Sequence, residues 1–345
     1  MPRIAMFDAK TYDQEFFSEA NKSYGFDISF FEARLNANDA VLVEGHDTAC
    51  VFVNDFVNPE VADVFVKKGV KLLALRSAGY NHIDLDALKG KIDVVRVPAY
   101  SPHAVAEHAL ALIMTLNRKT HRAYTRTRDN NFSIGGLLGF DMNGKTAGIV
   151  GTGQIGRIMC EILRGLNMRV LAYDPYPAIE WANAQGVEYV NLSRLYKESE
   201  IISLHCPLTA ENVHLIDRAT IAQMKTGVMI INTGRGKLIR TEDLLEALRS
   251  GKVGAAGLDV YEEETDFFFE DHSSNIIRDD NLLRLLAYPN VLVTSHQAFF
   301  TREAMSNIAN ITLENVRSYF EEGRIANPVP DFDSETGRVG VEQTS

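Results

Sequence analysis

The sequence predicts an α/β protein with two domains, each built on a parallel sheet flanked by helices. Short apolar strands alternate with helical segments along most of the chain, which is the pattern of parallel sheets. The stretch Lys145–Asp174 reads as strand, glycine turn, helix and strand, one complete unit of such a sheet. At 345 residues, 46% of them hydrophobic, the chain is long enough for about two domains with two buried cores.

Six apolar segments in the first hundred residues predict the strands of the first domain. They are Ile4–Phe7, Ile28–Phe31, Ala40–Val43, Val51–Val53, Leu72–Leu75 and Val94–Val97. Between them, Pro59–Lys68 and Asp84–Lys89 have the spacing of short amphipathic helices, and Gly69 suits the C-cap of the first. This region has no glycine turn of the type that follows Val150, so a second domain must carry that turn.

A long helix is predicted at Pro102–Arg118, where alanine and leucine recur throughout and a basic residue stands at the end. We place the crossover between the domains in this helix. The following stretch, Thr125–Phe140, is broken by Gly135 and Gly136, and it is predicted to be a loop or arm rather than a core element.

Seven further apolar segments predict the strands of the second domain. They are Ala147–Val150, Val170–Tyr173, Tyr189–Val190, Ile201–Leu204, Val228–Asn232, Gly254–Val260 and Val291–Thr294. A helix is predicted at Thr241–Arg249, with Thr241 as its N-cap. The last long helix, Thr301–Glu321, comes after this set of strands is complete, so we expect it to return to the first domain.

The glycine turn predicts a dinucleotide site of the Rossmann type. Gly151 permits the tight turn, Gly153 lets the backbone approach a pyrophosphate, and Gly156 lets the helix pack on its strand. Asp174 ends the second strand, 18 residues after Gly156, where a carboxylate can accept hydrogen bonds from the ribose hydroxyls. That carboxylate would repel a 2′-phosphate, and no guanidinium follows it directly, so NAD rather than NADP is the predicted cofactor.

These elements define the predicted domain organisation. Residues 1–100 and 298–332 form a discontinuous substrate or catalytic domain, and residues 101–297 form an NAD-binding Rossmann domain. The active-site cleft is expected between the two domains. Residues 333–345 are polar and unpatterned, and a disordered tail is predicted there.

Composition excludes several kinds of partner. The formal net charge is −11 without a basic block, which argues against nucleic acid and against a membrane surface. The three cysteines, Cys50, Cys160 and Cys206, lie far apart without the spacing of metal ligands, and their odd number argues against a disulfide framework. Neither a signal-peptide core nor a run of 18 apolar residues is present, so a cytoplasmic enzyme without a metal is predicted.

Ionisable residues follow three of the predicted strands of the second domain. Arg235, Asp259, Glu264 and His296 should therefore meet at the carboxyl edge of the sheet, beside the nicotinamide. A hydride-transfer enzyme must polarise the substrate oxygen and exchange one proton. The planar guanidinium of Arg235 suits the first task. Histidine, with an ordinary pKa of about 6.5, suits the second when a carboxylate such as Glu264 stabilises its charged form.

These motifs, with Arg76–Asp84 (RSAGYNHID), resemble the D-isomer-specific 2-hydroxyacid dehydrogenases over almost the whole chain, to about Asp331. The stretch Asp259–Asp271, with its insertion at Phe267–Asp271, and the motif starting at His296 are most similar to the fermentative, D-lactate-forming members of that family. The resemblance implies reduction of pyruvate to D-lactate with NADH. It also implies a homodimer, usually formed through the cofactor domains, or a higher homo-oligomer.

The resemblance also implies a role for each site residue. His296 would donate the proton, Glu264 would hold and charge His296, and Arg235 would bind the substrate carboxylate and carbonyl. The implied substrate contacts are Ala78, Gly79, Tyr100, Arg235, Phe52 and Phe299. The implied cofactor contacts, with Gly151, Gly153 and Gly156 of the turn, are Gln154, Ile155, Asp174, Cys206, Pro207, Asn212, Thr233, Gly234, Arg235 and Asp259. Gly234 departs from the serine that relatives often carry, which puts one cofactor hydrogen bond in doubt.

Two alternatives remain open from the sequence. One is a sister dehydrogenase for a longer-chain 2-keto acid, against which bulky Phe52, Tyr100 and Phe299 favour a methyl-sized substrate. The other is a non-catalytic, NAD-binding regulatory protein, since the resemblance extends to corepressors that keep the same motifs. Turnover of NADH with pyruvate would separate the enzyme from the regulatory protein.

Overall fold

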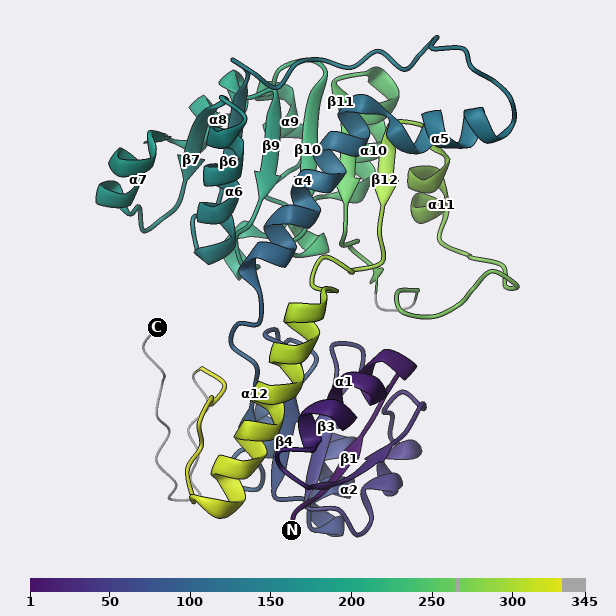
Figure 1. Ribbon diagram of the computed structural model, residues 1–345, viewed down its shortest axis with the longest axis vertical. Helices are drawn as coiled ribbons and strands as arrows, with labels where there is room; N and C mark the ends of the chain where they lie inside the picture. Colours follow the sequence, from purple (N-terminus) through teal and green to yellow (C-terminus); the bar gives the residue numbers. More distant parts are fainter. Residues whose placement is uncertain (265–266, 331–345) are drawn as a thin grey trace. The chain divides into compact units, whose positions relative to one another are not determined.

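The computed structural model describes residues 1–264 and 267–330, and the predicted tail at 333–345 lies outside the described residues (Figure 1). The chain forms two compact units. Among the described residues, unit 1 comprises residues 1–101 and 300–330, and unit 2 comprises residues 102–264 and 267–299. Within the described part of the chain, no helix has the length and apolar composition needed to cross a membrane.

Unit 1 is built on a five-stranded parallel sheet with strand order β2-β1-β3-β4-β5. The strands are β1 (Arg3–Met6), β2 (Asp27–Phe30), β3 (Thr48–Val51), β4 (Leu72–Leu75) and β5 (Asp93–Val95). The helices are α1 (Thr11–Asn21), the 3₁₀ helix η1 (Asp39–Val43), α2 (Pro59–Lys68), α3 (Leu85–Leu88) and α12 (Arg302–Glu321). Helix α12 packs against α1 and β4 within unit 1.

Local signals explain the elements of unit 1. Strands β3 and β4 are buried at every position, as apolar central strands of a parallel sheet should be. The Asn58 side chain accepts a hydrogen bond from Val61 N–H at the start of α2, and Gly69 ends that helix at φ 82°. Thr301 caps α12 in the same way.

Unit 2 is built on a seven-stranded parallel sheet with strand order β12-β11-β10-β9-β6-β7-β8. The strands are β6 (Thr146–Val150), β7 (Arg169–Tyr173), β8 (Val187–Tyr189), β9 (Ile201–Leu204), β10 (Val228–Asn232), β11 (Val253–Leu258) and β12 (Val291–Val293). The chain order reverses between β6 and β9, which is the switch point where ligands bind in doubly wound sheets. The predicted fold class of two parallel-sheet α/β domains is therefore confirmed.

Helices cover both faces of this second sheet. The helices of unit 2 are α4 (Pro102–Arg118), α5 (Thr120–Arg128), α6 (Gln154–Gly165), α7 (Ile179–Gln185), α8 (Leu192–Glu198), η2 (Ala210–Asn212), α9 (Arg218–Gln223), η3 (Gly236–Leu238), α10 (Thr241–Ser250) and α11 (Asp280–Ala287). Two separate hydrophobic clusters result, one packed under α9, α10 and α11 and the other under α4 and α6.

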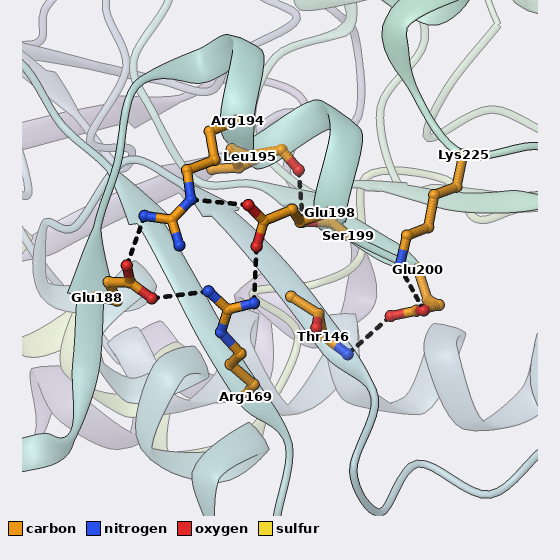
Figure 2. Close-up of polar contacts among 9 residues, drawn as sticks. All are labelled: Thr146, Arg169, Glu188, Arg194, Leu195, Glu198, Ser199, Glu200 and Lys225. Carbon is orange, nitrogen blue, oxygen red and sulfur yellow. Dashed lines mark hydrogen bonds and ion pairs between the residues drawn. The ribbon is translucent and has the colours of Figure 1, made fainter.

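An ion-pair ring lies on the surface of unit 2 (Figure 2). Arg169 at the start of β7 binds Glu188 of β8 at 2.8 Å and Glu198 of α8 at 2.7 Å. Arg194 of α8 binds the same two carboxylates, at 2.5 and 2.7 Å. Each guanidinium therefore contacts both carboxylates, and the four side chains tie α8 to the edge of the sheet. We call these four residues the surface ring.

Two local predictions were wrong, and a third was wrong only over its first four residues. Residues 40–43 form the 3₁₀ helix η1 and not a strand, because Asn36 Oδ1 accepts from the N–H groups of Asn38 and Asp39 and starts a helical turn. The loop or arm predicted at Thr125–Phe140 is observed at residues 129–140, but residues 125–128 belong to α5. That helix has no buried residue and hence no apolar stripe for a sequence pattern to reveal. Thr241 is not the N-cap of α10, because the Glu262 carboxylate, distant in sequence, accepts its N–H at 3.1 Å.

Candidate active site

The glycine turn of unit 2 leaves no space for side chains at two of its three glycines. A Cβ on Gly151 would lie 2.6 Å from Cys206 N, and Gly151 itself has φ 91°. A Cβ on Gly156 would lie 1.9 Å from Gly151 O, so only glycine permits this close helix–strand packing. A Cβ on Gly153, in contrast, would meet nothing within 4 Å, which leaves room for a ligand against the backbone.

Helix α6 begins directly at this turn. Its N-cap residue, Gly153, provides no side-chain hydrogen bond, so the first N–H groups of the helix remain for an anion. Gln154 at the helix start is exposed, whereas Ile155 packs against the core. This arrangement fits a pyrophosphate and supports the predicted positions of both residues.

The Asp174 carboxylate at the end of β7 is held in place by three donors. Oδ2 accepts from Thr152 N–H at 2.7 Å and from Thr152 Oγ1 at 3.0 Å, and Oδ1 accepts from Tyr176 N–H at 2.9 Å. Thr152 Oγ1 also bonds the Tyr189 hydroxyl at 2.7 Å. Thr152 and Tyr189 were missed by sequence reasoning. Thr152 stands inside the glycine motif, and this position could have indicated that it lies beside the cofactor site.

The loop after β9 carries three of the predicted cofactor contacts. Cys206 is partly buried, and burial raises the pKa of its thiol to about 11, which keeps it neutral. Asn212 Nδ2 donates to Pro207 O at 2.7 Å and closes the loop. After β10, the hydroxyl of Thr233 is buried and has no hydrogen-bond partner among the described residues. Such an orphaned group beside the switch point fits a site completed by a bound cofactor.

Arg235 lies in the loop that follows β10. The Asn232 side chain fixes this loop by donating to Arg235 O at 2.9 Å and accepting from Gly234 N–H at 3.0 Å. The Arg235 guanidinium folds back on Gly234 O at 2.8 Å. A Cβ on the next residue, Gly236, would lie 2.0 Å from Tyr261 O, so the arginine loop packs directly on the loop that precedes Glu264.

The structure pairs His296 with Glu264. The imidazole Nδ1 lies 3.0 Å from Glu264 Oε1, and both side chains are about one-fifth exposed, at 20% and 22%. The other carboxylate oxygen accepts from Tyr261 N–H at 2.9 Å, which orients the glutamate. The Phe269 ring lies 5.9 Å from the imidazole. The predicted partners therefore meet, and the Tyr261 backbone links them to the arginine loop.

Asp259 is fully buried, and its carboxylate holds the histidine loop. Oδ1 accepts from Gln297 N–H and Oδ2 from Ala298 N–H, each at 2.9 Å, while His296 N–H donates to Asp259 O at 2.7 Å. Burial would raise the pKa of Asp259, but hydrogen bonds from His108 and Thr294 outweigh it and lower the pKa. The predicted role of Asp259 was a cofactor contact, and the loop contacts were missed. They give His296 its left-handed conformation at φ 54°.

The predicted substrate residues of unit 1 lie at the carboxyl ends of β3, β4 and β5. Ala78 and Gly79 form a partly exposed loop whose two N–H groups bond no other described residue. Ser77 Oγ donates to Gly79 O at 2.8 Å, and an Arg96 guanidinium nitrogen donates to Ala78 O at 3.2 Å. Both contacts hold the carbonyls away from the free N–H groups, which suits the binding of an anion.

The three aromatic residues predicted at the substrate differ in exposure. Phe52 lies in the turn after β3 and is almost fully buried, as is Phe299 in unit 2. Tyr100 is partly exposed, and its carbonyl accepts from Asn307 Nδ2 at 2.6 Å. The two phenylalanines are therefore far less accessible than Tyr100.

A doubly wound sheet, a glycine turn at its switch point, an acidic residue after the second strand and a histidine–glutamate pair at the strand ends define a dinucleotide-dependent oxidoreductase. Comparison with known sequences refines this class. Residues 110–298 match the family described as D-isomer specific 2-hydroxyacid dehydrogenase, NAD binding domain. The chain belongs to the D-isomer-specific 2-hydroxyacid dehydrogenase family, and the predicted family and NAD cofactor are confirmed.

Individual relatives cover almost the whole chain. D-lactate dehydrogenase of Escherichia coli K12 is 52% identical over 322 residues, which are 93% of this chain and 97% of that protein. Its apo structure superposes with a TM-score of 0.86 at 50% identity, over 93% of this chain and 97% of the other. The structure of D-2-hydroxyisocaproate dehydrogenase has a TM-score of 0.84 at 30% identity, over 95% and 99%.

Proposed function

We propose that this chain is an NAD-dependent D-lactate dehydrogenase, which reduces pyruvate to D-lactate. The observation that carries the proposal is the His296–Glu264 pair at 3.0 Å, at the carboxyl edge of a sheet that bears an NAD-binding turn. The 52% identity to a D-lactate dehydrogenase supports lactate as the product within the family.

In this proposal His296 is the proton donor. Because Nδ1 is bound to Glu264, Nε2 is the ring nitrogen that can reach a substrate carbonyl oxygen. Glu264 fixes the ring orientation and stabilises the charged imidazolium, as the acidic member of a catalytic pair does. NADH, when bound, would supply the hydride that the carbonyl carbon needs. His296 would give its proton to the carbonyl oxygen, which becomes the hydroxyl of lactate.

Arg235 is proposed to bind the substrate carboxylate and polarise its carbonyl. Its guanidinium now rests on Gly234 O, a single neutral acceptor that a carboxylate can replace with a stronger, charge-assisted bond. The two N–H groups of Ala78 and Gly79 would bind the same carboxylate, and Tyr100 would add a hydroxyl contact. Phe52 and Phe299 would limit the space for the substrate side chain.

The cofactor contacts follow from the positions described above. The α6 N-terminus with Gln154 and Ile155 is proposed to bind the pyrophosphate, and Asp174 the adenosine ribose. Further cofactor contacts are proposed in the loops after β9, β10 and β11, at Cys206, Pro207, Asn212, Thr233, Gly234, Arg235 and Asp259. The orphaned Thr233 hydroxyl supports this assignment.

A panel of 2-keto acids tests the proposed substrate. We expect kcat/KM for pyruvate with NADH to exceed that for 2-ketoisocaproate, because a methyl side chain needs less space. The similarity to D-2-hydroxyisocaproate dehydrogenase makes the branched acid the sharpest competitor. A higher kcat/KM for the branched acid would replace lactate by a longer-chain product. Binding of NADH without turnover of any 2-keto acid would favour a regulatory protein.

A homodimer is proposed from an apolar arm on unit 2. Helix α5 has no buried residue, and the segment that follows it exposes Phe132, Ile134 and Leu138 at 74%, 83% and 88%. Such contiguous apolar exposure marks an interaction surface. We expect light scattering to give twice the chain mass, and Ile134→Asp with Leu138→Asp to give the monomer mass. Ile276→Asp, at a position 89% exposed outside the arm, is the matched control and should leave the dimer intact.

A cytoplasmic location is also proposed. All three cysteines are free, with Cys50 and Cys160 buried, as expected of a protein from a reducing compartment. Cell fractionation, with activity recovered from the soluble fraction, would test this location.

A further inference from the structure

A charged cluster is buried in the core of unit 1, beneath the predicted substrate residues. Arg76, at the end of β4, is 2% exposed, and Asp13 of α1 and Asp55 after β3 are 1% and 0% exposed. We call these three residues the buried arginine cluster. Arginine is seldom buried to this extent unless its guanidinium has specific partners.

The Arg76 guanidinium contacts four groups. One nitrogen donates to Asp13 Oδ1 at 3.2 Å, and the other donates to Phe7 O at 3.0 Å and Asp8 O at 2.8 Å. The guanidinium also lies over the Phe52 ring, 4.4 Å from its centroid. Arg76 therefore joins the ends of β1, β3 and β4 with the first turn of α1, all within unit 1.

Asp55 closes the turn that bears Phe52. One oxygen of its carboxylate accepts from Phe52 N–H at 2.7 Å, and Asp55 N–H donates back to Phe52 O at 3.0 Å. The second oxygen accepts from Leu35 N–H at 2.7 Å. The phenylalanine ring is therefore held from one side by the arginine cation and at its backbone by the aspartate.

The same arginine begins the other segment predicted to face the substrate. Arg76 N–H donates to Val51 O at 3.1 Å, next to Phe52, and the chain continues directly into Ser77, Ala78 and Gly79. A displacement of Arg76 would thus move both the phenylalanine turn and the loop with the free N–H groups.

Stability alone does not account for the cluster. The buried Arg76 Nε has no hydrogen-bond partner in the described chain, and the removal of two carboxylates and a guanidinium from water is costly. Burial raises the pKa of Asp55 to about 6 against the opposing charge of Arg76, which shows that the site disfavours its own carboxylate charge. An apolar core of equal volume would avoid these costs.

We propose that the buried arginine cluster is a positioning device for the substrate, in which Arg76 and Asp55 fix Phe52 and the Ala78–Gly79 loop. The proposal rests on the substrate contacts assigned above. It makes Arg76 and Asp55 residues that determine specificity without touching the substrate, because they act through Phe52 and the loop.

Asp55→Asn is the test, because the amide keeps the side-chain shape but turns one acceptor into a donor facing a backbone N–H. We expect KM to rise about tenfold, as the loss of one buried hydrogen bond allows. Preference for pyruvate over 2-ketobutyrate should fall at least about threefold for the same reason, while the Kd for NADH, read by fluorescence, stays unchanged. The assay uses the 2-keto acid that the wild-type enzyme prefers. A failure of the lactate assignment can therefore be distinguished from a failure of the positioning proposal.

Asp93→Asn is the matched control. Asp93 is a buried aspartate of unit 1 at the opposite, amino end of β5, where it accepts from the Tyr319 hydroxyl at 2.9 Å. The Asp93→Asn substitution should lower the stability of the protein without changing KM or substrate preference. If Asp55→Asn behaves in the same way, the cluster only stabilises the fold and the proposal is overturned.

A double-mutant cycle with Phe52→Leu provides the second measurement. If Asp55 acts through the ring, its effect on substrate preference should largely disappear in the Phe52→Leu background. The cycle can also be measured if the Asp55→Asn variant gives little folded protein. It compares ratios of kcat/KM for two substrates, and these ratios do not depend on the enzyme concentration. Additive effects on preference would show that Asp55 acts independently of Phe52, which contradicts the proposal.

Discussion

The buried arginine cluster of unit 1 and the surface ring of unit 2 use the same charges in opposite environments. Arg76 and its two aspartates are at most 2% exposed, whereas the four side chains of the surface ring are 35–45% exposed (Figure 2). The guanidinium groups of the ring bind carboxylates alone, but Arg76 also binds two carbonyls and an aromatic ring.

The difference in exposure and partners between the two clusters indicates when an ion pair has a role besides stabilising its domain. Exposed pairs stabilise a protein by about 0–1 kcal/mol because water and salt screen them. In a buried pair each contact is stronger, but the removal of the charges from water has a large free-energy cost. The net effect of a buried pair on stability is therefore small or unfavourable. A buried cluster that contacts functional segments is therefore better explained by positioning, and an exposed ring by the anchoring of α8.

The largest expected effect lies outside both charge clusters, at the His296–Glu264 pair, which is intermediate in exposure. For His296→Ala we expect kcat to fall roughly 10² to 10⁴-fold, as for the loss of a general acid. The Kd for NADH should remain close to that of the wild type. Unchanged turnover would mean that the proton comes from another group and that the His296–Glu264 pair only stabilises the fold.

Arg76→Met should have the next largest effect. It leaves Asp13 and Asp55 buried without their cation, which costs about 3–5 kcal/mol of unfolding free energy. Arg169→Met in the surface ring removes an arginine with two carboxylate partners, but these are exposed, so the loss should be less than about 1 kcal/mol. Urea unfolding of both variants, followed by circular dichroism, measures the two losses. Equal losses would remove the distinction between the clusters.

The pH dependence of stability should have opposite signs in the two regions. Burial raises the pKa of Asp55 to about 6, so the folded state binds more protons than the unfolded state between about pH 4 and pH 6. The contribution of Asp55 to stability is fully present below that window and is lost as pH rises through it, by up to about 3 kcal/mol. Hydrogen bonds from Arg169 and Arg194 lower the pKa of Glu188, so its contribution is present above its ordinary pKa and is lost as pH falls.

The stability of each variant, subtracted from that of the wild type, isolates the contributions of Asp55 and Glu188. The difference between wild type and Asp55→Asn should decrease from pH 4 to pH 6, and the difference between wild type and Glu188→Gln should increase on leaving acid pH. Chemical denaturation at several pH values measures both. The same slope for both variants would contradict the assignment of burial as the dominant cause at Asp55.

The smallest expected effect is the salt dependence of the surface ring. The stability lost in Glu188→Gln should shrink further at 1 M salt, where the Debye length is about 3 Å. The loss in Arg76→Met should change little, because no mobile ions reach the buried cluster. Thermal unfolding at low and high salt compares the two variants. A loss in Arg76→Met that also shrinks with salt would mean that the cluster is accessible to water.

Much of this site could be predicted from the sequence, because its signals are local. The glycine turn needs residues without Cβ at fixed spacing, and Asp174 follows a strand whose apolar run is unambiguous. His296 and Glu264 could be paired because parallel strands bring their carboxyl ends to one edge. The resemblance to a known family added the roles that spacing alone does not supply.

The missed features depend on contacts between distant residues or lack an apolar pattern. Arg76 lies 63 residues from Asp13, and no sequence pattern indicates that an arginine after a strand is buried. Glu262 caps α10 from 21 residues away, and this is why Thr241 was wrongly taken as the cap. Helix α5 is polar on all sides, so its periodicity is invisible without the structure.

A chiral assay of the product formed from pyruvate and NADH tests the central claim most directly. The account predicts that the wild-type enzyme forms D-lactate, with one NADH consumed per lactate, and that His296→Ala forms almost none in the same time. L-lactate as the product, or consumption of NADH without lactate, would contradict it.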